Sequence, residues 1–461
     1  MERLSGLDAM YLYLETPSQP LNVCCVLEVD VAAALPGGYS FEQLRSDLEP
    51  RLRAIPEFRK KLAGGQLNID HPVWVETAQV DISRHLKRIA VPAPGGRVEV
   101  GEVCAHIAAL PLDRDYPLWE LWAVENPSTP KLLTLVVKAH HALVDGVGGA
   151  NIMTQLCSLE PDLPAPRDPV TPAPAANRLQ IAATGVLGVA TRPWRLTSLV
   201  PATLATVART VRRARAGHSM VAPFAAPRTL FNGPHSGRRC VAFVQLSLAD
   251  VKVVKDHYGL TVNDVVMALC AGALRTFLQR HDKLPDTPLV AAVPVSVHGE
   301  SDRPGRNQTS WMFCRLQSPM ADPVQRLRQM AESTAAAKAH SAELGPTLLQ
   351  DWTQFIGQYT MGVVKRLVPR VPRPGNPPFN LILSNVPGPQ VPLYLARYRI
   401  EAVYPFGPIL AGAGLNITAM SYHGQLGFGI ISSPDLVPDL WSLADAFPAA
   451  LEELLGSITN P

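Results

Sequence analysis

Residues 140–146 of this 461-residue chain read His140-His141-Ala142-Leu143-Val144-Asp145-Gly146, and the prediction of the fold starts from this stretch. The apolar run before it, residues 132–137, predicts a buried strand. The glycines after it, within residues 146–149, predict a turn that leads into a helix. The stretch therefore lies where a core strand becomes a loop, which is a common position for catalytic side chains.

The two neighbouring histidines are expected to have different tasks. Adjacent residues of a strand point to opposite faces, so one imidazole faces a cavity and the other faces the protein interior. A neutral imidazole, with an ordinary pKa of about 6.5, accepts a proton from a hydroxyl at neutral pH. This chemistry suits an acyl transfer in which an alcohol attacks a thioester. Two structural histidines followed by an ordinary Asp-Gly turn are the alternative.

Other chemistries find no support in the sequence. Neighbouring strand histidines diverge and no nearby side chain completes a ligand set, so no metal is expected. The chain contains no GxSxG elbow, P-loop or GxGxxG motif. Its seven cysteines are scattered without CxxC spacing, which favours reduced thiols in a cytosolic protein over a disulfide framework. The net charge of +3 does not indicate nucleic-acid binding, and no signal peptide is expected at the start.

The pattern along the chain predicts two α/β halves separated by a linker. Strands are expected at 21–27, 119–124, 132–137, 240–246, 289–297, 310–316 and 380–383, with a hairpin formed by 415–421 and 426–431. Helices are expected after Ser40, from Thr261 or Asn263 to about 279, and from Pro438 onward. Prolines crowd residues 161–174, which predicts an extended segment. The predicted divisions are 1–160, 161–238 and 239–461.

The linker region has an unusual charge pattern. Residues 169–249 contain no Asp or Glu but ten arginines, interspersed with apolar runs such as 179–189. Arg192, Pro193 and Pro201 interrupt any apolar run well before the roughly 20 residues that a membrane-spanning helix needs. The pattern favours interfacial helices on an anionic membrane or lipid droplet. A flexible linker with an accidental basic bias is the alternative.

Five further segments narrow the interpretation of the histidine motif. They are Leu4-Ser5-Gly6-Leu7-Asp8-Ala9-Met10, Pro117-Leu118-Trp119-Glu120, Asn263-Asp264-Val265-Val266, Ser384-Asn385-Val386-Pro387-Gly388-Pro389 and Gly414-Leu415-Asn416-Ile417-Thr418. Together with HHxxxDG they resemble the bacterial wax ester synthase/acyl-CoA:diacylglycerol acyltransferase family, especially the actinobacterial triacylglycerol synthases. The resemblance covers nearly the whole chain. HHxxxDG alone is also found in chloramphenicol acetyltransferases and condensation domains, so PLWE and SNVPGP are the more specific segments.

This resemblance implies a fold and an activity. The expected fold is α/β (α+β), with two chloramphenicol-acetyltransferase-like halves in one chain and the active-site channel between them. The expected activity is O-acyl transfer of a long-chain fatty acyl group from acyl-CoA to a lipid hydroxyl, giving triacylglycerol from diacylglycerol or a wax ester from a fatty alcohol. Acyl-CoA is then a co-substrate, and no cofactor is expected.

The resemblance also implies roles for particular residues. His141 is expected to be the general base, in a reaction without an acyl-enzyme, and His140 to support the loop. Asp145 is expected to have a structural or orienting role, and Gly146 to allow positive φ and close backbone approach. Candidates for the oxyanion or channel contacts, each of which fits an ordinary cap or turn equally well, are Ser384, Asn385, Asn416, Thr418 and Asn263. Candidates for binding the phosphates of coenzyme A are Arg238 and Arg239.

Two other functions fit parts of the sequence. A condensation-type acyltransferase shares the histidine motif but uses carrier-protein thioesters, and PLWE with SNVPGP argues against it. A non-catalytic lipid-binding or droplet-coating relative would keep the motif behind a blocked channel. The expected location is cytoplasmic, at the periphery of the inner membrane or on lipid droplets.

Overall fold

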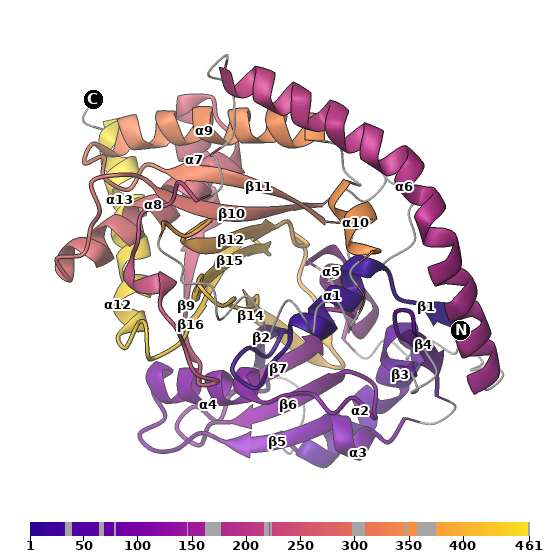
Figure 1. The fold of residues 1–461 in the computed structure, drawn as a ribbon. Helices are drawn as coiled ribbons and strands as arrows, with labels where there is room; N and C mark the ends of the chain where they lie inside the picture. Colours follow the sequence, from indigo (N-terminus) through magenta and orange to yellow (C-terminus); the bar gives the residue numbers. More distant parts are fainter. Residues whose placement is uncertain are drawn as a thin grey trace.

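Two large sheets form the centre of the computed structural model. In Figure 1 the six-stranded sheet lies in the upper part of the view and the seven-stranded sheet in the lower part. The structure describes residues 1–32, 39–63, 69–77, 80–144, 146–161, 177–215, 221, 224–296, 309–344, 348–355, 357 and 375–459. The α/β class expected from the sequence is confirmed.

The seven-stranded sheet holds the histidine motif. Its strands, in the order β5-β6-β7-β2-β14-β13-β8, are Leu86–Ala90, Trp119–Glu125, Leu132–His140, Asn22–Asp30, Tyr398–Phe406, Tyr394–Leu395 and Cys157–Ser158. The predicted strand pair is confirmed, since β6 and β7 are antiparallel neighbours. A small sheet beside it, in the order β1-β4-β3, consists of Glu2–Arg3, Val73–Glu76 and Lys60–Ala63.

The six-stranded sheet belongs to the second half of the chain. Its strands, in the order β11-β10-β12-β15-β16-β9, are Thr309–Leu316, Leu289–Ser296, Leu381–Val386, Leu415–Tyr422, Gln425–Ser432 and Cys240–Ser247. The predicted hairpin is confirmed, because β15 and β16 pair around His423 and Gly424. Both turn residues have positive φ, 43° and 78°, as a tight two-residue hairpin turn requires.

Strand β14 ties the two sheets together. It follows β12 in the chain, but it pairs with β2 of the first sheet, where Val403 lies opposite Leu27. Glycines of β16 let the sheets approach, because a Cβ on Gly427 or Gly429 would overlap the carbonyl oxygens of Val403 or Pro405. Strands β13 and β14 belong to segment 239–461 but lie in the sheet of segment 1–160. The predicted division at residues 160 and 238 stays a prediction.

Helices pack around the two sheets and, in the case of α1 and α5, between them. They are α1 Gly6–Leu14, α2 Phe41–Ala54, α3 Ile82–His85, α4 Arg97–Ala109, α5 Gly146–Leu156, α6 Arg178–Arg215, α7 Leu248–Tyr258, α8 Val262–Arg280, α9 Pro323–Leu344, α10 Leu348–Thr353, α12 Leu440–Ala444 and α13 Ala446–Thr459, with short 3₁₀ turns at Pro56–Arg59 and Leu230–Asn232. The most buried of them is α8, which packs against α7, α9 and α13 beside the second sheet. Thr261, rather than Asn263, is its N-cap, through a reciprocal pair with Asp264.

Helix α6 takes up most of the described part of the predicted linker. Figure 1 shows it on the outside of the molecule, running from beside β1 to beside α9. The sequence favoured several interfacial helices here, but Arg178–Arg215 is one helix that continues through Pro193 and Pro201. The proline-dense residues 162–176 lie outside the described part. No single described helix is long and apolar enough to cross a membrane, and α7 with α8 reaches that length only as a pair bent by 106°.

Candidate active site

The two histidines of the motif point in different directions, as the alternation of a strand predicts. His140 is the last residue of β7, and its backbone N–H donates to the carbonyl of Leu118. His141 follows, and its N–H donates to the carbonyl of Leu21 at the start of β2. The His140 side chain is 1% exposed, whereas the His141 side chain lines a cavity. The backbone of both residues is therefore held by neighbouring strands.

The cavity lies between the two halves of the chain and has a volume of about 260 Å³. Strands β2, β7 and β14 and helices α1 and α5 form one side, and β10, β11, β12 and β15 form the other. Most of its wall is apolar, including Tyr11, Cys25, Ile152, Met153, Trp311, Phe406 and Met420. Such a wall suits an acyl chain and excludes water from the reacting groups.

Four of the predicted oxyanion or channel residues line this cavity with His141. They are Ser384, Asn385, Asn416 and Thr418. They come from β12 and β15, which are parallel neighbours in the second sheet, with Ser384 opposite Thr418. The tertiary structure therefore brings polar groups of the second half to the same cavity as the histidine of the first.

The hydrogen bonds of these residues distinguish them. The Thr418 hydroxyl donates to Asn416 Oδ1 over 2.9 Å, and Asn416 Nδ2 donates to the carbonyl of Pro408 over 2.9 Å. Asn385 Nδ2 donates one hydrogen bond, over 3.3 Å, to Asn263 Oδ1, which leaves its second hydrogen for another acceptor. Among the described residues, Ser384 Oγ has no hydrogen-bond partner. Ser384 and Asn385 thus each have a hydrogen available to an acceptor in the cavity.

Helix α1 and its C-cap residue contact the two histidines. The ring of Tyr11 stacks on the ring of His141, with centroids 4.0 Å apart and planes 10° apart. One turn later, Glu15 Oε1 lies 3.5 Å from His140 Nε2. The Ala142 N–H donates to His140 Nδ1, so the neutral ring carries its proton on Nε2, which faces the carboxylate. Tyr11 within α1 and Glu15, the residue that caps its C-terminus, thus contact the histidine pair.

Glu15 is ionised in this position. Burial acts to raise the pKa of its carboxyl group, but the contacts with His140 and Arg114 outweigh burial and lower the pKa to about 2. Arg114 Nη2 donates to Glu15 Oε2 over 2.7 Å. Tyr11 and Glu15 were not among the predicted site residues. No helix was predicted for this segment, so nothing in the sequence signalled that these two side chains would reach the histidines.

The remaining predicted residues have other surroundings. Asp145 lies outside the described residues, and Gly146 begins α5. Arg239 is 8% exposed and donates to the carbonyls of Ser236, Arg238 and Ser18. Its guanidinium is therefore used to hold the N-terminal loop, which does not favour a contact with phosphate. Arg238 is exposed.

The described residues of this cavity offer neither a reactive thiolate nor a set of metal ligands. Cys24 and Cys25 both line it, but burial raises the pKa of each thiol to about 12. At neutral pH these thiols stay protonated and are poor nucleophiles. Within the described ranges, no three His, Cys, Asp or Glu side chains gather as a metal site would require. Among the described residues of the wall, the groups that remain for chemistry are the imidazole of His141 and the polar side chains opposite it.

Comparison with protein families gives two matches that follow one another along the chain. Residues 4–266 match the wax ester synthase/diacylglycerol acyltransferase catalytic domain, and residues 306–455 match the C-terminal domain of the same proteins. A protein of Mycobacterium tuberculosis provisionally named diacylglycerol O-acyltransferase is 57% identical over 455 residues, covering 99% of this chain and 90% of that protein. Another from the same organism, with the same provisional name, is 33% identical and covers 95% of this chain and 92% of its own length.

Solved structures show the same relation at the level of the fold. The wax ester synthase/diacylglycerol acyltransferase from Marinobacter aquaeolei VT8 superposes with a TM-score of 0.71 at 26% identity, over 100% of both chains. The first condensation domain of the calcium-dependent antibiotic synthetase superposes with a TM-score of 0.59 at 13% identity, over 100% of this chain and 96% of that domain. The second likeness concerns the fold alone.

Proposed function

The chain belongs to the wax ester synthase/diacylglycerol acyltransferase family, and from that premise we propose how it catalyses acyl transfer. It is an acyl-CoA-dependent O-acyltransferase. The acceptor that we propose is a lipid hydroxyl, either diacylglycerol or a long-chain alcohol, and the donor is a long-chain acyl-CoA. One observation supports this assignment most directly: His141 and the polar residues of β12 and β15 share an apolar cavity between the two halves.

In the proposed reaction, His141 is the general base. Its Nε2 accepts the proton of the acceptor hydroxyl as that oxygen attacks the carbonyl carbon of the thioester. The tetrahedral oxyanion is stabilised by Ser384 and Asn385, whose polar groups line the cavity. When the intermediate collapses, the C–S bond breaks, and the thiolate of coenzyme A takes the proton back from His141. The products are an ester and free coenzyme A, without an acyl-enzyme.

The supporting roles follow from the same geometry. His140 holds the end of β7 through Glu15 and the Ala142 N–H. The apolar wall aligns the acyl chain, and positioning in a dry cavity supplies much of the rate. We expect no metal or prosthetic group to be needed, because the imidazole supplies proton transfer and acyl-CoA is already an activated donor.

We also propose that the enzyme is peripheral to the cytoplasmic face of the inner membrane or to lipid droplets, through segment 161–238. Its proposed acceptors reside in lipid, and the described cysteines are all free thiols, as is usual in a reducing compartment. Recovery with membranes at low salt and release at high salt would support this location. Recovery in the soluble fraction at low salt would contradict it.

The test of the reaction is a comparison of the wild-type enzyme with His141→Ala. Both are incubated with labelled palmitoyl-CoA and either diacylglycerol or hexadecanol, and His257→Ala, at an exposed histidine of α7, is the control. Wild type and control should form ester, while His141→Ala should lose about 10²-fold or more in rate. Equal rates for wild type and His141→Ala would exclude the general-base role. Acyl transfer from a carrier-protein thioester but not from palmitoyl-CoA would favour a condensation-type enzyme.

A further inference from the structure

The outward face of α6 is apolar, although a surface helix ordinarily turns polar residues to water. Its largest exposed side chains are Trp194, 76% exposed, and Leu179, 70% exposed. We call the exposed stripe the outer stripe of α6, and it consists of Leu179, Val186, Leu187, Trp194, Val200 and Leu204. The inward face carries Ile181 and Leu199, which are buried. Exposed apolar groups repeated along one helix mark an interaction surface rather than scattered exposure.

The charges around the outer stripe indicate what it contacts. No acidic residue occurs between 169 and 249, so α6 offers no repulsion to an anionic surface. Exposed arginines lie near both ends of the helix, Arg178 at the start and Arg209 and Arg212 near the end. An apolar stripe with arginines beside it is typical of helices that lie in the interface of anionic lipids.

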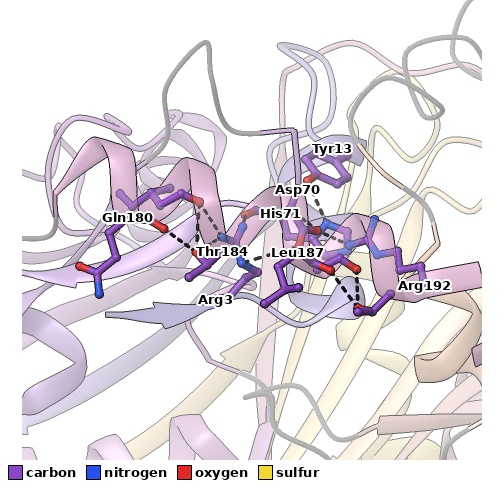
Figure 2. Close-up of polar contacts among 11 residues, drawn as sticks. Arg3, Tyr13, Asp70, His71, Gln180, Thr184, Leu187 and Arg192 are labelled. Carbon is purple, nitrogen blue, oxygen red and sulfur yellow. Dashed lines mark hydrogen bonds and ion pairs between the residues drawn. The ribbon is translucent and has the colours of Figure 1, made fainter. Parts of the chain in front are cut away.

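A buried ionic cluster fixes the orientation of this helix. Figure 2 shows Arg3, Asp70, His71 and Arg192 together where α6 meets the loop before β4. The Asp70 side chain is 4% exposed and pairs with Arg192 of α6 and, at 3.7 Å, with Arg3. Arg3 also donates to the carbonyl of Ile181 on α6 over 3.0 Å. We call these four residues the Asp70 clamp.

The clamp contacts α6 closely at a glycine of the helix. A Cβ on Gly188 would lie 2.5 Å from Asp70 Oδ2, so the helix approaches the carboxylate at a glycine. Further along, Trp352 of α10 donates to Thr203 of α6 over 3.0 Å. The alternative for this region was a flexible linker with an accidental basic bias. Such a linker would not need the buried carboxylate of Asp70 paired with two arginines. These contacts hold α6 to the folded body at several points, and a surface held in advance loses less entropy on binding.

The clamp also connects α6 to the cavity. His71 Nδ1 lies 3.1 Å from the hydroxyl of Tyr13 on α1. Two residues earlier on α1, Tyr11 lines the cavity and stacks on His141. The clamp therefore joins α6 to α1, the helix that carries Tyr11.

Resting on the proposed function, we propose that the outer stripe of α6 is the lipid-docking surface of this enzyme. Its partner is an anionic bilayer or monolayer, and the Asp70 clamp keeps the stripe turned toward it. Apolar side chains enter the interface, while the arginines contact acidic headgroups.

Vesicle flotation tests the docking surface. Wild type should float with vesicles of phosphatidylcholine and phosphatidylglycerol at 7:3 and much less with phosphatidylcholine alone. The double variant Leu187→Ser/Trp194→Ser should lose about tenfold or more in partitioning, since each side chain contributes apolar area. The control is Leu159→Ser/Val253→Ser, at exposed apolar positions outside α6, and it should float like wild type. Equal flotation of the two double variants, or no flotation of wild type, overturns the proposal.

Two further measurements separate this proposal from its premises. Ester formation in detergent micelles should be the same for wild type and Leu187→Ser/Trp194→Ser, because neither residue lines the cavity. Failure of wild type to form ester in micelles refutes the proposed function. The flotation assay contains no substrate, so its outcome tests the docking surface alone. Asp70→Asn, checked for its fold by circular dichroism, should float several-fold less than wild type. A folded Asp70→Asn that floats like wild type overturns the role of the clamp.

Discussion

Replacing Glu15 with Gln should weaken both the fold and the turnover of this enzyme. The carboxylate of Glu15 faces His140 Nε2 at 3.5 Å and receives a hydrogen bond from Arg114 over 2.7 Å. Gln has nearly the same size but no charge, so the contact with Arg114 loses its ionic component and the Nε2–H of His140 loses its charged acceptor. Because His140 directly precedes His141, a shift at this strand end displaces the proposed base.

The lowered pKa of Glu15 sets an upper limit on the unfolding free energy that the substitution removes. A fall from 4.5 to about 2 corresponds to at most about 3 kcal/mol of stability at pH 7. The folded pKa lies below the unfolded one, so this stability is fully present above pH 4.5 and is lost as the pH falls toward 2. The side chain is only 12% exposed, so solvent screens the interaction little. A glutamine at this position does not titrate and has no such pH dependence.

Urea unfolding at pH 7 and pH 3.5 measures this effect. The difference in unfolding free energy between wild type and Glu15→Gln should shrink by about 1 kcal/mol at the lower pH. The control is Glu49→Gln, which removes a partly exposed pair with Arg53 and should cost less than about 1 kcal/mol. A difference that stays constant between the two pH values would refute the assignment of an ionised, stabilising Glu15.

Steady-state kinetics separates positioning from simple loss of stability. Glu15 does not line the cavity, so the KM for palmitoyl-CoA should change by less than about threefold, while kcat falls by about tenfold or more. These rates are measured at a temperature at which the variant is fully folded. A raised KM with an unchanged kcat would mean that Glu15 shapes substrate binding rather than the base.

Two other substitutions test the stacking of Tyr11 on His141 and the packing of β16 against β14. Tyr11→Phe keeps the ring that stacks on His141, so it should retain at least about fivefold more kcat than Tyr11→Leu, since aromatic stacking contributes about 1 kcal/mol; equal kcat values would show that the stack does not orient the base. Gly429→Ala would place a Cβ against the carbonyl oxygen of Pro405, so thermal and urea unfolding should show a loss of about 3 kcal/mol or more. A fully stable Gly429→Ala would mean that β14 and β16 can separate at no cost.

Local sequence was sufficient to predict much of the secondary structure. The apolar runs at β7, β9, β10 and β15 predicted strands because the hydrophobic effect acts on each segment by itself. The glycine after His423 predicted its hairpin because only a few residues tolerate positive φ. At the start of α8, the sequence left Thr261 and Asn263 open, and only the hydrogen bonds of the structure decided for Thr261.

For the site, the order of residues along the chain was enough to predict which residue types are available and on which strand ends they stand. His141 follows a buried strand, and Ser384 and Asn385 lie at the end of another. Alternation along β7 also predicted that the two histidines diverge, since neighbouring side chains of a strand must point to opposite faces.

Which of these groups meet depends on how distant elements pack against one another. The cavity exists because β14 crosses into the first sheet and because Gly427 and Gly429 let the sheets approach. Tyr11 and Glu15 joined the site because α1 packs across the end of β7. The Asp70 clamp likewise joins residues that are more than a hundred positions apart in the chain. Contacts of such sequence separation depend on how whole elements pack, and a local pattern of residues carries no record of that packing.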